Sequence, residues 1–445
     1  MTGALLRRLG APETVARLRR LAAGAAPSAP LSLRFDLGTT VTDWLHAVPS
    51  DAPFWYEARP ARGQFRLALG HALQVTSAGA HRFAALDNAF AGLAAAWRHD
   101  GGARAFCGFA FDPRAQGPLP NALLALPALL FEADGDGCRA IFTTTANRLD
   151  EAPADWQRLL ACSTPTPAPS SPPVVADTTL ADRAWQGRVH AALRHITAGH
   201  AEKIVLSRER RLTSAVPPAP ADLLAALVRQ QPASTVFAHG TGSTFFLGAS
   251  PERLVRVHGR QVVADALAGT AWPGSAALDG TKNRHEQALV GTAVLEALAG
   301  ACSAPPQAGP LEVRQAGGVA HLRTRIAGQL RPGVSLFELL RALHPTPAVG
   351  GFPGPAALAW LAAHGERRSA WYSGGFGSLT PDGDGEIAVP LRSALVHGQC
   401  IDLQAGAGIV AGSDPAQELA ETEAKFATLL DALRALQGER GRAAG

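Results

Sequence analysis

The chain has 445 residues, of which 47% are hydrophobic, and its formal net charge is only +4. This length and composition suffice for a large buried core, in one domain or in two or three smaller ones. The small net charge, with no continuous basic stripe and interleaved aromatic residues, argues against a nucleic-acid-binding protein. The five cysteines are far apart and form no CxxC pair, which argues against a disulfide framework and a structural zinc site.

Two segments of the first half bear on where the protein resides. The first 24 residues, MTGALLRRLGAPETVARLRRLAAG, are rich in arginine and alanine but lack the apolar run of a signal peptide. We expect a basic amphipathic helix on the protein surface there, with a transit peptide as the alternative. The most apolar stretch, ALLALPALLF at 122–131, is shorter than the roughly 20 residues of a membrane span and is expected in the core. The sequence therefore predicts a soluble, cytoplasmic protein that does not bind a membrane.

A proline-rich segment divides the chain. Residues 163–175, STPTPAPSSPPVV, contain too much proline for a helix or a central strand, so we expect an extended, exposed connection. The first half, residues 1–162, contains short β-like patches such as GQFRLALGHALQVTS. The second half, residues 176–437, contains AWQGRVHAALRHITAGH, in which apolar residues recur at helical spacing and Gly199 provides a stop.

A strand is predicted directly after this helix, in AEKIVLSRER at 201–210. Alternation places Lys203 and Val205 on one face and Ile204 and Leu206 on the other, so neither face is plainly exposed to solvent. Lys203 either keeps its ammonium group in water at the end of the strand or works as a base in a buried site. The stretch taken alone favours the first interpretation.

Paired strands dominate the rest of the second half. STVFAHGTGSTFFLGAS predicts two strands around a turn, RLVRVHGRQVVADAL predicts another hairpin, and IDLQAGAGIV predicts a strand before a long helix that begins at 413–415. This order predicts an α+β fold with antiparallel sheets. The glycine-rich segments LAGT (267–270), SGGFG (373–377) and AGAG (405–408) are expected to be turns. They match no nucleotide-binding motif, but their backbone N–H groups are able to approach an anion.

One loop has a distinctive stiffness. LHPTPAVGG at 343–351 is too rich in proline for a helix, because Pro345 and Pro347 fix an extended conformation. Such a loop suits the wall of a tight pocket, and it suits a plain surface connection equally well.

Four acidic residues of the second half are candidates for chemistry. Glu252 follows a proline at the end of an apolar strand, and Glu286 lies in the first turns of a predicted helix. Glu418 and Glu421 share one helical face with Lys425. The plainer interpretations are a surface carboxylate at a turn and a solvated helix face with an ion pair. If three of these carboxylates converge, their oxygen atoms suit Mg²⁺.

Nine motifs of the second half together resemble those of the chorismate-utilising enzymes, and within them the isochorismate synthases. In the order of that family they are KIVLSR, GASPERL, LAGT, KNRHE, HLRT, LHPTPAVGG, YSGGFG, ALVHG with an arginine just before it, and GAGIVAGSDPAQELAETEAK. The resemblance is close over about residues 185–435 and looser in the first half, where FWYEARP and FCGFAFDP match. It implies one domain over residues 1–445, with four α/β/β/α layers and two large antiparallel sheets, in which 163–175 is an internal loop.

The resemblance also implies a reaction and the residues that perform it. Isochorismate synthases add water at C2 of chorismate while the C4 hydroxyl departs, which requires a base and an acid on opposite sides of the ring. Lys203 matches the base and Glu252 matches the acid, and desolvation favours the neutral amine that a lysine base requires. Glu286 and Glu421, with Glu418 close by, match the carboxylates that bind Mg²⁺, which orients the ring carboxylate.

Further positions match residues around the substrate in that family. They are Thr270, His321, Ala348, Tyr372, Arg392, Gly408 and Lys425. Chorismate is the expected partner, with no glutaminase subunit and no nucleic acid, and the expected assembly is a monomer or a homodimer. The pathway served stays open among menaquinone, siderophore and salicylate biosynthesis.

Single positions separate the related activities. Aminodeoxychorismate synthases have a lysine nucleophile where this chain has Ala268, and anthranilate synthases lack the lysine at Lys203, so both activities are disfavoured. A salicylate synthase, which goes on to eliminate pyruvate, stays an alternative, as does a non-catalytic chorismate-binding homologue. The latter is expected to have lost the base or the acid. Departures from the family pattern at Asn283, Gln287 and 271–274 (AWPG) remove no base, acid or metal ligand.

Overall fold

The computed structural model of the chain describes residues 2–38, 44–49, 52–135, 137–161, 173–175, 178–273, 275, 278 and 280–443. The helices are α1 (Thr2–Leu9), α2 (Pro12–Ala22), η1 (Leu45–Ala47), η2 (Pro60–Arg62), α3 (Arg82–Ala96), η3 (Ala146–Arg148), α4 (Ala152–Ala161), α5 (Thr179–Thr197), α6 (Pro220–Gln230), α7 (Thr281–Ala299), α8 (Leu336–Leu343), α9 (Gly354–Ala363) and α10 (Pro415–Ala443). The strands are β1 (Pro30–Gly38), β2 (Phe54–Arg59), β3 (Gln64–Ser77), β4 (Arg98–His99), β5 (Ala105–Phe109), β6 (Ala122–Asp134), β7 (Gly137–Thr145), β8 (Val174–Val175), β9 (Lys203–Thr213), β10 (Thr235–Thr241), β11 (Thr244–Ser250), β12 (Arg253–His258), β13 (Gln261–Ala271), β14 (Gln307–Ala316), β15 (Val319–Gln329), β16 (Gly351–Phe352), β17 (Gly375–Leu379), β18 (Gly385–Ala388), β19 (Ser393–His397) and β20 (Cys400–Val410).

These strands form one hydrogen-bonded network, in which every pairing between described strands except β1–β4 is antiparallel. Its long path runs β9–β20–β19–β11–β10–β2–β3–β6–β5–β17–β18–β12–β13–β15–β14. The two predicted sheets are therefore continuous with each other through the long strands β3 and β6. The α+β class with antiparallel pairing is confirmed.

The two halves of the chain share this network. Strands β2, β3, β6 and β5 come from the first half, yet they lie between β10 and β17 of the second half. Of the proline-rich connection, residues 163–172 lie outside the described residues. Its end forms strand β8, which pairs with β9. The first half therefore supplies the centre of the path, and the second half supplies its two ends, which carry most of the predicted site.

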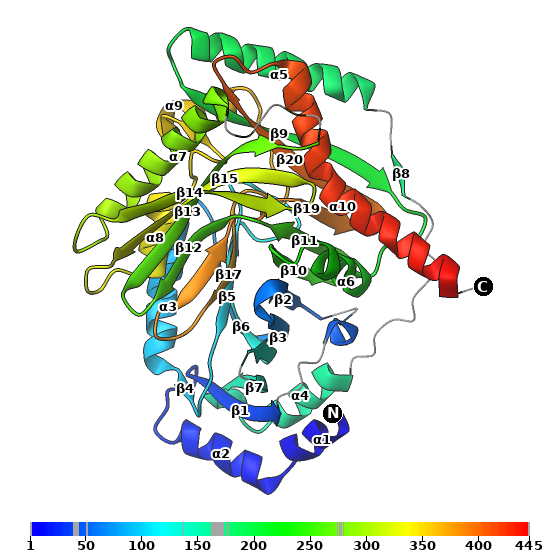
Figure 1. Cartoon of the computed structure of the whole chain (residues 1–445). Coiled ribbons are helices and arrows are strands. Elements are labelled where there is room, and N and C mark those ends of the chain that lie inside the picture. Colours follow the sequence, from blue (N-terminus) through cyan, green and yellow to red (C-terminus); the bar gives the residue numbers. More distant parts are fainter. Residues whose placement is uncertain are drawn as a thin grey trace.

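Helices cover the two ends of the path (Figure 1). Helices α5 and α10 pack against β9 and β20, whereas α7 packs against β13 and β15. In α5 the predicted apolar face is buried at Trp185, Val189 and Ile196, where it contacts the aliphatic side chains of β9, while Leu193 is only half-buried. Gly199, with φ of +77°, follows the end of this helix as predicted.

Several local predictions are confirmed and two are wrong. The hairpins β10–β11 and β12–β13 form, and the segment at 122–131 is a buried part of β6. The four described cysteines are not joined by a disulfide bond. The basic N-terminal segment is two helices rather than one, because Pro12 begins the second. The glycine-rich segments expected as turns lie largely in strands, LAGT in β13, 375–377 of SGGFG in β17 and AGAG in β20. The last agrees with the strand predicted for IDLQAGAGIV, which is confirmed. No helix within the described ranges is long and apolar enough to cross a membrane.

Candidate active site

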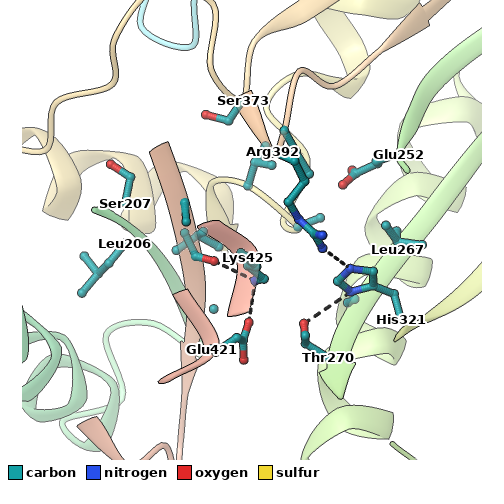
Figure 2. Close-up of a pocket in the computed structure, with 18 of the residues that line it drawn as sticks. Leu206, Ser207, Glu252, Leu267, Thr270, His321, Ser373, Arg392, Glu421 and Lys425 are labelled. Atoms are coloured by element: carbon teal, nitrogen blue, oxygen red, sulfur yellow. Dashed lines mark hydrogen bonds and ion pairs between the residues drawn. The ribbon is translucent and has the colours of Figure 1, made fainter. Parts of the chain in front are cut away.

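A cavity lies where the two ends of the strand path meet, and its volume, with its mouth, is about 670 Å³. Strands β9 and β20 and helix α10 supply one wall, while β13 and β15 supply another. Figure 2 shows Glu421 and Lys425 on one side and Thr270 and His321 on the other, with Arg392 reaching across. Ten of the twelve residues predicted from the sequence line this cavity: Glu252, Thr270, Glu286, His321, Ala348, Tyr372, Arg392, Gly408, Glu421 and Lys425.

The other two predicted residues, Lys203 and Glu418, lie behind the lining. Lys203 is fully buried at the start of β9, and its Nζ lies 2.7 Å from Oε1 of Glu286. Lys203 therefore does not keep its ammonium group in water, and the surface interpretation of this strand is wrong. Burial of an ammonium group is tolerable when a carboxylate compensates it. This ion pair stabilises the charged ammonium, so a neutral amine requires that the contact with Glu286 opens.

The contact between Lys203 and Glu286 depends on a glycine of β20. A Cβ atom added at Gly408 would lie 2.5 Å from Oε1 of Glu286 and 2.8 Å from Cε of Lys203. Glu286 also accepts a hydrogen bond from the N–H of Gly269, at 3.2 Å. Burial acts to raise the pKa of Glu286, but Lys203, Lys425 and Lys282 together hold it below its usual range. Glu286 is thus a carboxylate at neutral pH.

Unlike Glu286, Glu252 has a pKa above its usual range. It follows β11 and is only 3% exposed, so its interpretation as a surface carboxylate is wrong. Burial, with Asp265 adding to it, raises the pKa of Glu252 to about 8, although Lys203 and Lys425 act in the other direction. A carboxyl group with this pKa is largely protonated at neutral pH, and it is able to donate a proton.

Arg392 provides an unsatisfied positive group in the cavity. One of its nitrogens, Nη2, lies 2.6 Å from Nε2 of His321. Nδ1 of His321 lies 3.1 Å from the carbonyl oxygen of Gly269, so the geometry fits a neutral imidazole with its proton on Nδ1. Burial, and then Arg392, lower the pKa of His321 well below its usual range, in agreement with this state. The other terminal nitrogen of Arg392, Nη1, is buried and has no hydrogen-bond partner among the described residues, so it is available to a substrate carboxylate.

Three lysines neutralise the carboxylates proposed for a metal. Lys203 pairs with Glu286, Lys282 lies 2.5 Å from Glu418, and Lys425 lies 2.5 Å from Glu421. The helix that carries the last two carboxylates begins at Pro415, where the carboxylate of Asp414 accepts a hydrogen bond from the N–H of Gln417. Glu418 is 1% exposed, so this part of the helix is not a solvated face.

The carboxylates fit a divalent cation in their chemistry. Burial, and then the neighbouring Glu421, raise the pKa of Glu418 to about 7, so an added cation would favour the ionised form of this group. Atom Oε2 of Glu418 is buried and has no partner in the described part of the chain. Among the described residues, however, no set of three His, Cys, Asp or Glu side chains is arranged to hold a metal.

Two residues of the site were missed by the sequence-based prediction, Lys282 and Arg368. A signal for Lys282 is present in the sequence, because the chain contains only three lysines among its 41 basic residues and all three lie here. For Arg368 there is no comparable signal, since arginine is common along the whole chain.

Arg368 ties together three segments of the cavity wall. Its guanidinium donates hydrogen bonds to the carbonyl oxygens of Val205 (2.9 Å) and Val349 (2.8 Å) and to the hydroxyl of Ser373 (2.7 Å). The side chain is 4% exposed, and it also pairs with Glu366. Arg368 therefore joins strand β9, which carries Lys203, to the loop at 343–351 and to the turn after Tyr372. The loop at 343–351 is therefore a pocket wall, as one of its two interpretations predicted.

We expect Arg368→Lys to weaken substrate binding more than turnover, because an ammonium group cannot replace donors that point in three directions. The expected result is a KM for the substrate raised roughly tenfold and a free energy of unfolding lowered by about 2 kcal/mol. Steady-state kinetics and thermal melting check this, with the adjacent exposed Arg367→Lys as the matched control. Equal effects of the two substitutions would show that Arg368 does not position the wall.

Comparisons with known proteins identify the family of this chain. The family model described as chorismate binding enzyme matches residues 31–434. The chain is 34% identical over 422 residues to a salicylate biosynthesis isochorismate synthase from Pseudomonas aeruginosa, and the match covers 87% of this chain and 86% of the relative. It is also 34% identical over 259 residues to the isochorismate synthase MenF from Bacillus subtilis, covering 56% of this chain and 55% of that protein.

Solved structures give the same result for the fold. MenF, the menaquinone-specific isochorismate synthase from Escherichia coli, superposes with a TM-score of 0.77 and 26% identity, covering 94% of this chain and 98% of that one. Anthranilate synthase component I from Streptococcus pneumoniae superposes with a TM-score of 0.68 over 83% of this chain and 92% of that one. At 20% identity the second likeness concerns the fold alone.

Proposed function

Because the chain belongs to the family of chorismate binding enzymes, we propose that it is an isochorismate synthase that requires Mg²⁺. The observation that carries the proposal is a buried acid in the cavity wall together with a buried lysine behind that wall. Glu252 is buried with a pKa raised to about 8 by desolvation, and the fully buried Lys203 is close enough to act against that shift. An acid that is protonated at neutral pH beside an amine is the combination that a hydration with loss of hydroxide requires.

Lys203 and Glu252 each perform one proton transfer of the proposed reaction. Lys203, once its contact with Glu286 opens, removes a proton from a water molecule whose oxygen bonds to C2 of chorismate. The ring double bonds shift, the bond between C4 and its hydroxyl oxygen breaks, and Glu252 protonates that oxygen so that it leaves as water. One water molecule enters and one leaves, so the product is an isomer of the substrate.

The remaining side chains hold the substrate's two carboxylates. Arg392 offers its free Nη1, and the ammonium of Lys425 lies in the lining. His321, neutral and held by Gly269, fixes the orientation of Arg392. Glu286, Glu418 and Glu421 are the proposed ligands of Mg²⁺, which would supply positive charge to the ring carboxylate.

The direct test is incubation of the purified protein with chorismate, with and without Mg²⁺, followed by chromatographic separation of the products. We expect isochorismate as the product, formed with Mg²⁺ and lost on chelation. Salicylate together with pyruvate would instead identify a salicylate synthase. Unchanged chorismate, with ammonia present or absent, would identify a non-catalytic homologue.

A further inference from the structure

Lysine is rare in this chain, and every lysine is paired with a carboxylate proposed to bind the metal. Of the 41 basic residues only Lys203, Lys282 and Lys425 are lysine, and the other 38 are arginine. Each lysine forms an ion pair with a different one of three carboxylates, Glu286, Glu418 and Glu421. A chain that uses arginine for its basic residues everywhere else thus has an ammonium group at these three positions. Arginine and lysine differ here in that a guanidinium binds a carboxylate through two hydrogen bonds, whereas an ammonium is a point charge on a flexible chain.

Lys203 and Lys425 already have roles in the proposed reaction, but Lys282 has none. It lies in the first turn of α7, four residues before Glu286, so both point from the same helical face. Its Nζ lies 2.5 Å from Oε1 of Glu418, a residue on a different helix. Burial lowers the pKa of Lys282, but Glu418, Glu421 and Glu286 outweigh it and raise that pKa above the usual value. Lys282 therefore lies within electrostatic reach of all three carboxylates.

The three lysines differ in their access to solvent. The side chain of Lys203 is 1% exposed and that of Lys425 is 14% exposed, whereas that of Lys282 is 38% exposed. Of the three lysines, Lys282 is thus the one whose ammonium group can move most easily from its carboxylate into solvent. With three ammonium groups and three carboxylates the set is neutral, so a divalent cation cannot join it favourably unless positive charge withdraws.

We propose that Lys282 is an internal counter-ion that occupies Glu418 when no cation is bound and is displaced into solvent when a divalent cation binds, so that this lysine sets the metal affinity of the site. The inference rests on the proposed function, since it presumes the Mg²⁺ requirement. It accounts for the lysine at this position, because an arginine would hold Glu418 through two hydrogen bonds and would be harder to displace.

The experiment measures Mn²⁺ binding, as a probe for the metal, by electron paramagnetic resonance at alkaline pH, where the carboxylates are ionised. Lys282→Met should bind Mn²⁺ roughly tenfold more tightly than the wild type, because the competing charge is gone. Lys282→Arg should bind it more weakly. The matched control is Arg284→Met, which removes a positive charge from an exposed position two residues further along α7 and should leave the affinity close to that of the wild type.

Thermal melting provides a second readout that does not depend on activity. Without metal, Lys282→Met should melt below the wild type, because Glu418 loses its partner, and Mn²⁺ should raise its melting temperature by more than it raises that of the wild type. Wild-type binding with equal or weaker binding in Lys282→Met would overturn the inference and leave the metal requirement standing. No Mn²⁺ binding by the wild type would instead remove the metal from the proposed function.

Discussion

Substitution of Lys203 by alanine is expected to lower kcat/KM for chorismate by roughly a thousandfold, the range in which removal of a general base falls. The amine is fully buried, and no other lysine is close enough to take its place without leaving its own carboxylate. Initial rates of isochorismate formation measure the loss. Because the change also creates space beside Glu286, added primary amines should restore part of the rate, and the restored rate should depend on the basicity of the amine.

The control for this prediction separates charge from base function. Lys203→Ala leaves the buried Glu286 without its 2.7 Å partner, which costs about 3 kcal/mol of stability when a buried ion pair is broken on one side. Lys203→Arg keeps the positive charge but offers no group that deprotonates near neutral pH. It should therefore be as inactive as the alanine variant. Normal turnover by either variant would remove the base assignment.

The rate of hydration should fall as the pH rises through about 8, because Glu252 must carry a proton to release the C4 hydroxyl as water. Its pKa is raised to about 8 by burial, so the acid is present below that pH and is lost above it. On the descending limb kcat/KM should decrease tenfold per pH unit. This dependence reports the free enzyme.

Glu252→Gln tests the same assignment by removing the proton that Glu252 is proposed to donate. The amide has nearly the same shape as the acid but cannot donate a proton in this way, so kcat/KM should fall by roughly a thousandfold and the descending limb at pH 8 should disappear. Glu252→Asp should retain a descending limb with a lower rate. A descending limb that persists unchanged in the glutamine variant would show that another group is the acid.

How much of the structure the sequence predicts depends on how far apart along the chain the interacting residues lie. Helix α5 and the hairpin β10–β11 were predictable because their signals, an apolar repeat and a glycine turn, lie within a few residues. Strand β9 was correctly placed, but the environment of Lys203 was not decidable, since aliphatic side chains occupy both faces. Its burial follows from Glu286 and Gly408, which lie far along the chain.

The site itself became predictable only through the resemblance of nine motifs taken together. Residues that form no motif stayed hidden, and Arg368 is an example, since its three acceptors come from three separate segments. The segment at 405–408 was predicted both as part of a strand and as a turn, and the strand is what forms. Gly408 is required by the side chains of Lys203 and Glu286 that pass over it in a strand, and nothing in the neighbouring sequence indicates that contact.

The pairing of every lysine with one of three neighbouring carboxylates has a consequence for chemical labelling. In most proteins an acylating or reductively methylating reagent modifies many surface amines, and an effect on function is hard to assign. Here the only side-chain amines are those of Lys203, Lys282 and Lys425, and the most accessible of them is Lys282, with 38% of its side chain exposed. Apart from the α-amino group, an amine-directed probe therefore reacts at the proposed active site. A reporter group can be attached there without any engineered residue.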